Sequence, residues 1–483
     1  MNLLSFVVLA NLLLPASPAI LGDTEESPVA GEVSGVGCTP PGENSGSLKK
    51  ASPDISATSA TPVILSDSEE SPVAGEGSGV SGEARVMVRD GLLSIERENF
   101  KLWGDIRFQA DAGTFFGAPG FCNRTFDGGD NPDHIGSGII LRRARVAIKS
   151  LLYGKWFAQV EAEISAHPEL TYAFLAYKGI PYLTLKGGLT DEDFSMQQNA
   201  SFHNMTFLER SMAVSLAPSI HVGFDAQYSR DWLWLGAGVF GPEAATGDHV
   251  DGVAENNRLG RDEGLSWTGK IAFRPFYKNP DAGLHIGGAF SRRDPKLSSG
   301  AGYKAVRYSS RNATAINTKK YLDTGIIGQV DHERAWIAEL AGFWKGLYFE
   351  NAYIARGAFL ENGLGHQWAR GFYSQASYLL FGSRQKFDYD EDQPAGVDFG
   401  ANKGDLELAA RFDWCDLNTV AFKGGSCKAF TLGVNWFPTH NVKLMLNWTY
   451  NNNDRFADGA GTLTSGDTGV DYHMLAMRLQ VRF

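Results

Sequence analysis

The sequence is poor in several features that would point to common classes of protein. Beyond its N-terminus it has no run of 18 apolar residues, so transmembrane helices are excluded. Its four cysteines, Cys38, Cys122, Cys415 and Cys427, show no CxxC spacing, and its ten histidines are scattered. No Ser/His/acid grouping stands out. We therefore expect no enzyme activity, no cofactor, no metal site and no nucleic-acid partner.

The N-terminal residues 1–19 contain neither lysine nor arginine. Their apolar stretch, Leu3–Leu14, is too short to span a bilayer, and Ser17-Pro18-Ala19 offers small residues for cleavage. We interpret residues 1–19 as a secretory signal peptide.

The following residues, 20–90, are rich in Ser, Gly, Pro and Glu, with 12 acidic against 4 basic residues. Most of the net charge of -11 therefore lies in this segment, and the rest of the chain is nearly neutral. Ile20–Val36 recurs as Ile64–Val80 with 14 of 17 positions identical. This composition predicts a disordered, acidic, low-complexity segment, followed by one folded domain over 91–483.

The stretch Ile139–Ser165 shows the pattern that governs this domain. It predicts two β-strands joined by a turn at Tyr153-Gly154-Lys155, because apolar and polar residues alternate with a period of two. In the first strand Arg143, Arg145 and Lys149 share one face. Ala144, Val146, Ile148 and Leu152 share the opposite face.

From residue 100 onward this alternation predicts sixteen strands. Short connections alternate with longer ones, as in a transmembrane β-barrel. The acidic connection 382–404 is too long for its place in this order, and a missed hairpin would explain it. The predicted strands are 100–112, 137–151, 155–165, 170–178, 181–189, 219–229, 231–240, 265–274, 282–291, 333–343, 347–357, 368–381, 405–415, 427–437, 441–450 and 470–483.

The last strand carries the strongest barrel signal. Leu475, Met477, Leu479, Val481 and Phe483 form one apolar face that ends at the C-terminus. Arginine and glutamine occupy the opposite face, which a water-filled lumen tolerates and a soluble core would not. The fold class is therefore all-β, a transmembrane antiparallel barrel of about sixteen strands. Six tryptophans near strand ends are expected at the membrane interfaces: Trp103, Trp156, Trp232, Trp234, Trp436 and Trp448.

Five segments in order resemble the phosphate-selective porin O and P family of outer-membrane channels. They are LRRARVAIKSLLYGKW (Leu141–Trp156), LTLKGGLT (Leu183–Thr190), FLERS (Phe207–Ser211), LELAARFDWCDLN (Leu406–Asn418) and TLGVNWFPTHNVKLMLNW (Thr431–Trp448). The resemblance implies a sixteen-stranded barrel, a homotrimer, and inward-folded loops that line a narrow anion path in the outer membrane of a Gram-negative-type bacterium.

The resemblance also implies roles for particular residues. It places Arg142 and Arg143 near the constriction and Arg210 in the third loop, residues 190–218. The alternation puts Arg143 inward but Arg142 on the other face, and a β-bulge or a rim position for Arg142 would reconcile the two. The same loop carries Asp191, Glu192, Asp193 and Glu209, which suit an anion path poorly.

A second basic region, residues 291–320, contains eight cations against one acid, Asp294. In the family the fifth loop folds inward and supplies a ladder of arginines. A basic loop that contacts lipopolysaccharide is the alternative. The cations proposed for the anion pathway are Arg142, Arg143, Arg145, Lys149, Lys186, Arg210, Arg292, Arg293, Lys304, Arg307 and Arg311.

Two cysteines, Cys415 and Cys427, lie at facing ends of a predicted hairpin. They could form a disulfide in an oxidising periplasm, or remain two free thiols.

We interpret the protein as a passive outer-membrane porin for anions, with phosphate or another oxyanion as the leading solute. Its expected surroundings are outer-membrane lipid and lipopolysaccharide. Two alternatives remain at this stage: a general diffusion porin of weak selectivity, and a structural or adhesive outer-membrane barrel whose lumen is plugged.

Overall fold

The computed structural model describes residues 85–89, 92–118, 135–165, 168–243, 264–295, 303–316, 319–361, 363–459 and 469–483. The predicted signal peptide and residues 20–84 of the predicted disordered segment lie outside these ranges, as do Cys38 and Cys122.

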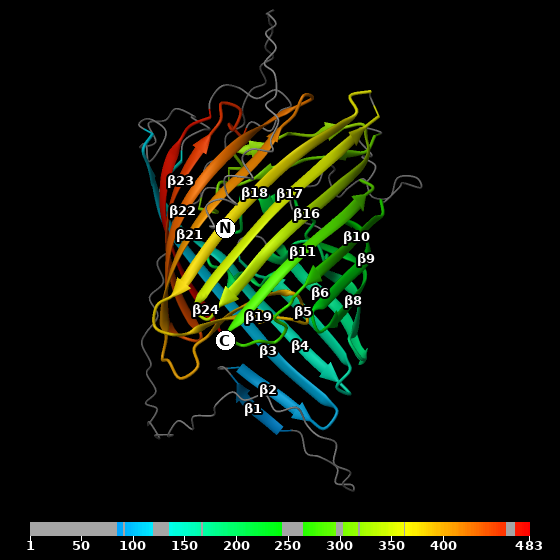
Figure 1. Ribbon diagram of the computed structural model, residues 1–483, viewed down its shortest axis with the longest axis vertical. Coiled ribbons are helices and arrows are strands. Elements are labelled where there is room, and N and C mark those ends of the chain that lie inside the picture. Colours follow the sequence, from blue (N-terminus) through cyan, green and yellow to red (C-terminus); the bar gives the residue numbers. More distant parts are fainter. Residues whose placement is uncertain are drawn as a thin grey trace, which may run out of the picture. The chain divides into compact units, whose positions relative to one another are not determined.

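Sixteen antiparallel strands close into a barrel (Figure 1), and each of them overlaps one predicted strand. Neighbours in the chain are neighbours in the sheet, and the last strand pairs with the first to close it. The barrel strands are β3 (Phe100–Phe116), β4 (Gly138–Leu152), β5 (Trp156–Glu163), β6 (Glu169–Ile180), β7 (Leu183–Asp191), β8 (Ile220–Arg230), β9 (Leu233–Glu243), β10 (Ser266–Phe273), β11 (Ala282–Arg293), β16 (Val330–Trp344), β17 (Leu347–Leu360), β18 (His366–Leu379), β21 (Asp405–Asn418), β22 (Lys423–Thr439), β23 (Val442–Asn453) and β24 (Tyr472–Arg482).

A hairpin of β1 (Arg85–Arg89) and β2 (Leu92–Arg97) precedes the barrel and extends its sheet. β2 pairs with the start of β3, where Ser94 lies opposite Trp103. Among the described residues, strand structure begins at Arg85, inside the segment 20–90 for which we predicted disorder.

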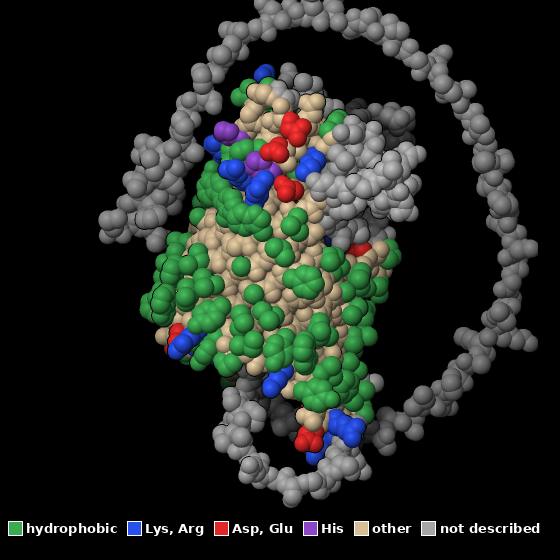
Figure 2. Space-filling model, turned by 90° about the vertical axis from the view of Figure 1, so that its right-hand side faces the viewer, with side chains coloured by type: hydrophobic (Ala, Val, Ile, Leu, Met, Phe, Trp, Pro, Cys, Tyr) green, Lys and Arg blue, Asp and Glu red, His purple; other side chains and the backbone are tan. Residues whose placement is uncertain are grey.

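The wall of the barrel is apolar outside and polar inside. On β24 the side chains of Leu475, Met477 and Leu479 are exposed, whereas Arg478 and Gln480 are buried. Figure 2 shows the outcome on one face: hydrophobic side chains cover the middle of the wall, and charged side chains gather toward its two ends. None of the helices among the described residues is long and apolar enough to cross a membrane.

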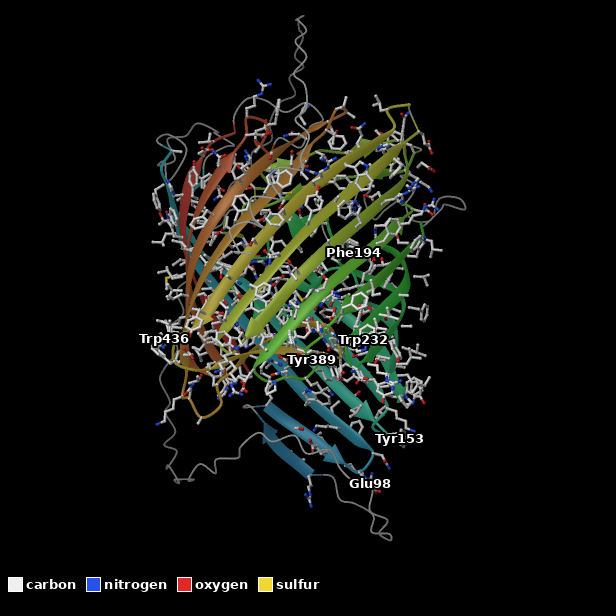
Figure 3. The ribbon with its side chains drawn as sticks, in the orientation of Figure 1. Glu98, Tyr153, Phe194, Trp232, Tyr389 and Trp436 are labelled. Atoms are coloured by element: carbon white, nitrogen blue, oxygen red, sulfur yellow. The ribbon has the colours of Figure 1, made fainter. Side chains whose placement is uncertain are left out.

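Four of the six tryptophans follow this arrangement, and Trp103 and Trp234 do not. Trp232 and Trp436 are about half exposed, and both lie near the end with the short turns (Figure 3). Trp103 was predicted at the membrane interface, and this was wrong, because it lies on the inward face of β3 opposite Lys149, which is bound to Asp105. Trp234 was predicted at the membrane interface, and this was wrong. Its side chain is 1% exposed and points inward, because on β9 it alternates with the outward Leu235.

Two long loops fold into the barrel from the end opposite the short turns. Loop L3 (192–219) contains α2 (Met196–Asn199), η1 (Phe202–Asn204) and η2 (Met212–Leu216). Loop L5 (294–329) contains four two-residue strands, which pair as β12 with β15 and β13 with β14. These strands are β12 (Ala305–Val306), β13 (Ser309–Ser310), β14 (Leu322–Asp323) and β15 (Ile327–Gly328).

An apolar core holds L3 against the inner wall. Met212 and Leu216 of η2 pack in one cluster with Ile354 of β17 and Tyr373 of β18. Gly371 permits this close approach, because a Cβ at that position would lie 2.5 Å from the Cβ of Ala213. The lumen therefore contains a packed loop, which narrows the space left for water.

A third segment enters from the end with the short turns. The acidic connection 382–404 contains the hairpin that its length suggested, formed by β19 (Arg384–Asp388) and β20 (Gln393–Asp398). The residues between these strands reach the inner wall, where Tyr389 accepts hydrogen bonds at its carbonyl oxygen from Ser229 (2.9 Å) and from Arg274. Figure 3 shows Tyr389 within the outline of the barrel, near its lower end.

Candidate functional site

A β-bulge turns two consecutive arginines of β4 into the lumen. The register between β3 and β4 runs from Gln109 opposite Arg143 to Ala110 opposite Leu141, so that Arg142 has no partner. The extra residue restores an inward direction for Arg142 beside Arg143. Of the two explanations left open by the sequence, the bulge is the one that the structure contains.

The two arginines meet a carboxylate from L3. Arg142 donates two parallel hydrogen bonds to Glu209, at 2.7 and 3.0 Å, and Arg143 donates one at 3.4 Å. Arg478 lies on β24, the other strand that pairs with β3. It donates one hydrogen bond to the same carboxylate, at 2.8 Å, and two to Asp111, at 2.6 and 2.8 Å. Three guanidinium groups therefore surround one carboxylate of the loop.

The FLERS segment, Phe207–Ser211, is the part of L3 that the wall holds most directly. Arg478 donates to the carbonyl oxygen of Leu208, and Arg411 donates to that of Glu209 at 2.9 Å. Asp413 accepts from the Ser211 hydroxyl at 2.8 Å and from the Met212 amide at 2.9 Å. Charged residues of β21 and β24 thus fix the loop backbone that carries Glu209 and Arg210.

An aromatic ring joins the arginines of the loop to those of the wall. The Phe202 ring lies 3.5 Å from the Arg143 guanidinium, 3.9 Å from that of Arg210 and 5.0 Å from that of Arg145. The face of a ring attracts cations, so Phe202 stabilises three like charges without neutralising them. Arg210 also donates to the main-chain oxygens of Gln197 (2.9 Å) and Ala200 (3.0 Å).

These groups line a cavity of about 230 Å³ between β4, L3 and L5, here called the arginine vestibule. Four of the predicted arginines reach it: Arg142 and Arg143 from β4, Arg210 from L3 and Arg311 from L5. Hydroxyl groups complete the lining, from Ser211, Ser215, Ser310 and Thr314. Guanidinium forks and hydroxyl donors around a space of this volume suit an oxyanion, which offers several acceptor oxygens.

The charges of the two adjacent loop residues are well defined. Burial opposes ionisation of Glu209, but Arg142, Arg143 and Arg478 hold its pKa well below the usual range. Burial lowers the pKa of Arg210 to about 10, which still leaves it charged at neutral pH. At pH 7 the vestibule therefore holds one negative and several positive charges.

Other predicted pathway cations lie inward but are bound to carboxylates. These contacts lower the positive charge that a solute would meet along the lumen. Arg145 contacts Glu161 (3.0 Å) and Glu163 (3.2 Å), Lys149 contacts Asp105 (2.8 Å), Lys186 contacts Glu391 (2.6 Å) and Arg293 contacts Glu192 (2.7 Å).

The structure corrects the prediction for one residue of the basic loop region. Arg292 is 44% exposed and pairs across strands with Trp267 and Arg334, on the outer face of the wall. Its place follows from the alternation of β11, which turns the neighbouring Arg293 inward. Arg292 is therefore not part of the lumen.

Two more residues of the basic region lie in L5 away from the vestibule lining. Lys304 directly precedes β12, and its carbonyl oxygen accepts from Val330 at 3.0 Å. Arg307 donates from Nε to Asp323 at 2.8 Å. Of the L5 cations, only Arg311 is among the described residues that line the vestibule.

The two cysteines lie directly opposite each other on β21 and β22. Cys415 and Cys427 are both buried, and both are free thiols in this structure. The disulfide thus stays a prediction for the oxidised protein.

Sequence reasoning missed several residues of the site. Phe202 was missed because nothing in the loop sequence marks an aromatic residue as a partner of arginines. Arg478 was assigned only to the polar face of the last strand, without a partner. The acids of the hairpin tip were noticed but not assigned partners, and they bind cations of the wall. Glu391 accepts from Lys186, and Asp392 lies 3.1 Å from Lys270 and 3.2 Å from His285.

The chain was compared with known proteins. A family model described as phosphate-selective porin O and P matches residues 121–483. Porin O of Pseudomonas aeruginosa is 24% identical over 401 residues, which cover 75% of this chain and 85% of that protein. An uncharacterized protein of Caulobacter vibrioides is 24% identical over 408 residues, covering 80% of this chain and 74% of that one. A solved anion-selective porin from Comamonas acidovorans has a TM-score of 0.48 at 12% identity, over 80% of this chain and 100% of that chain.

Proposed function

This chain belongs to the phosphate-selective porin O and P family and is an outer-membrane, anion-selective porin, and from that premise we propose that it passes phosphate or a similar oxyanion through the arginine vestibule. Transport would be passive, with no bond made or broken. The single observation that carries the proposal is the convergence of four arginines from β4, L3 and L5 on one cavity of about 230 Å³.

The vestibule supports this proposal through its chemistry. A guanidinium offers parallel donors that match two oxygens of a phosphate, and hydroxyl groups supply further hydrogen bonds. A row of such groups can replace the hydration shell of an anion in steps, so that the ion binds and still leaves.

A specific observation favours a second candidate, a diffusion porin of weaker selectivity. Arg145, Lys149, Lys186 and Arg293 are each bound to a carboxylate. A solute beyond the vestibule would then meet a nearly neutral wall. This candidate predicts a weak anion preference and no saturation by phosphate.

We also propose that three copies assemble in the outer membrane, in contact with lipid and lipopolysaccharide. The family resemblance of the sequence supports the trimer, and the exposed apolar belt supports the lipid contact. Mass measurement of the detergent-solubilised protein tests the assembly. The mass of a single chain for a protein that conducts would contradict it.

The test of selectivity is the zero-current potential of the purified protein in a planar bilayer under a KCl gradient, followed by titration with phosphate. We expect anion selectivity and a chloride current that phosphate blocks. Arg311→Ala should weaken this block by up to about fivefold, since an exposed charge pair contributes about 1 kcal/mol or less.

Arg292→Ala is the matched control, because Arg292 belongs to the same basic region but faces outward. It should leave both the potential and the block unchanged. Equal effects of the two substitutions would show that surface charge, and not the vestibule, sets the selectivity. Weak selectivity without block would support the diffusion porin.

A further inference from the structure

Glu209 stands in the arginine vestibule in the manner of a bound anion. Its two oxygens accept four hydrogen bonds from three arginines: two from Arg142, one from Arg143 and one from Arg478. The pair from Arg142 is the parallel fork that the guanidinium group also offers to phosphate. The carboxylate thus occupies a position on which the donors of three arginines converge.

The position of Glu209 also separates two spaces within the lumen. It lines the vestibule on one side, and on the other a smaller cavity of about 20 Å³ with Glu350, Gln375 and Arg411. Glu209 remains 16% exposed, so it borders the open space of the vestibule and is not sealed in the wall.

The three arginines differ in whether they also donate hydrogen bonds to groups other than Glu209. Arg478 also binds Asp111 through two hydrogen bonds, and Arg143 also donates to Gln109 at 2.8 Å. The fork of Arg142, in contrast, is directed at Glu209. Removal of the Glu209 charge would therefore free one complete fork while the neighbouring guanidinium groups stay anchored.

We propose that Glu209 is a tethered competitor that holds the oxyanion position of the vestibule and that a permeating anion must displace. The inference rests on the proposed function and adds to it a residue that competes for the binding position. A doubly charged tetrahedral oxyanion attracts three guanidinium groups more strongly than a singly charged carboxylate does, because the interaction scales with charge. Hydrogen phosphate or sulfate would thus displace Glu209 at a lower concentration than a monovalent anion would.

The experiment compares Glu209→Gln with the wild-type porin in planar bilayers at pH 8. Block of the chloride current is titrated with phosphate, with sulfate and with monovalent nitrate. We expect Glu209→Gln to lower the half-blocking concentration of phosphate and sulfate about tenfold, the effect of one charged hydrogen-bonding competitor removed. The nitrate value should fall by about the same factor, because a competitor for one shared position raises the half-blocking concentration of every anion alike.

Glu333→Gln is the matched control. Glu333 also accepts an arginine fork, from Arg356 at 2.8 and 2.9 Å, but it does not line the vestibule. It should leave all three half-blocking concentrations unchanged. Glu209→Asp is the second variant. It keeps the negative charge but places it one methylene further from the arginines, so it should strengthen the block less than Glu209→Gln does.

The outcomes separate this inference from the proposed function. If phosphate does not block the wild-type porin, the proposed function fails first. If phosphate blocks the wild type and block is unchanged in Glu209→Gln, or in a folded Glu209→Asp, the function stands and Glu209 is no competitor. A fall in anion preference in Glu209→Gln would likewise overturn the inference, since it would show that the carboxylate only positions the arginines.

Discussion

At the scale of residues, the vestibule depends on how like charges are kept close together. Arg143 and Arg210 both approach the Phe202 ring, at 3.5 and 3.9 Å, and the ring leaves their charge intact. Glu209 neutralises one charge of the same group. The positive potential that a solute meets therefore depends on two effects: the ring holds the arginines together, and the carboxylate cancels part of their charge.

Phe202→Leu tests the aromatic contribution. It keeps an apolar side chain but removes the ring face, so we expect the half-blocking phosphate concentration to rise by about two- to fivefold, the equivalent of about 0.5–1 kcal/mol of cation–π attraction. Phosphate titration of the chloride current measures it. Phe359→Leu removes a ring 4.5 Å from Arg334, outside the lumen, and should change nothing. Equal block in wild type and Phe202→Leu would contradict this role.

At the scale of elements, three segments narrow one barrel by different means. L3 is held by an apolar core and by charged residues of β21 and β24, whereas L5 forms short strand pairs of its own. The hairpin of β19 and β20 depends mainly on ion pairs, through Glu391 with Lys186 and Asp392 with Lys270. It should therefore respond to pH more strongly than the two loops.

Acid should release this hairpin. Burial would raise the pKa of Glu391, but Lys186 and Lys178 lower it to about 2; burial would likewise raise the pKa of Asp392, but His285 and Lys270 lower it to about 2. A carboxyl with a lowered pKa stabilises the docked form fully above its ordinary pKa, near 4.5 for Glu391, and this contribution is lost as the pH falls toward 2. We expect constant single-channel conductance from pH 7 to 5 and a reversible increase below pH 4.5.

The double substitution Glu391→Gln with Asp392→Asn supplies the comparison. It should show the higher conductance already at pH 7 and lose the acid transition. A transition that persists unchanged in the double variant would assign it to other carboxyl groups.

At the scale of the whole molecule, the barrel closes without the N-terminal segment. Strands β3 to β24 complete the sheet through the pairing of β24 with β3, and β1 and β2 only extend it at the short-turn end. The closed sheet leaves the barrel wall without an unpaired edge. Stability of the barrel should therefore not depend on the acidic duplicated tract.

Deletion of residues 20–84, with the signal peptide retained, tests this independence. We expect a folded barrel with unchanged conductance, visible as a band whose electrophoretic mobility shifts on heating. A failure to assemble, with no heat-modifiable band, would show that the tract takes part in folding or export.

The sequence by itself determined the architecture, because the signal for a barrel strand is local. Alternation with a period of two assigns each side chain to a face, and this placed all sixteen strands and the inward direction of Arg143, Arg145 and Lys149. It also identified the family, since five motifs occur in order. The acidic connection 382–404 was recognised as too long, and the hairpin accounts for it.

Only the tertiary structure decided which charges meet. Arg142 and Glu209 are 67 residues apart in the chain, and Arg478 and Glu209 are 269 apart, so no spacing could pair them. The bulge at Arg142 depends on cross-strand register, which one strand does not specify alone. Local periodicity therefore determines the fold, whereas the vestibule forms only where β4 and the loops L3 and L5 converge.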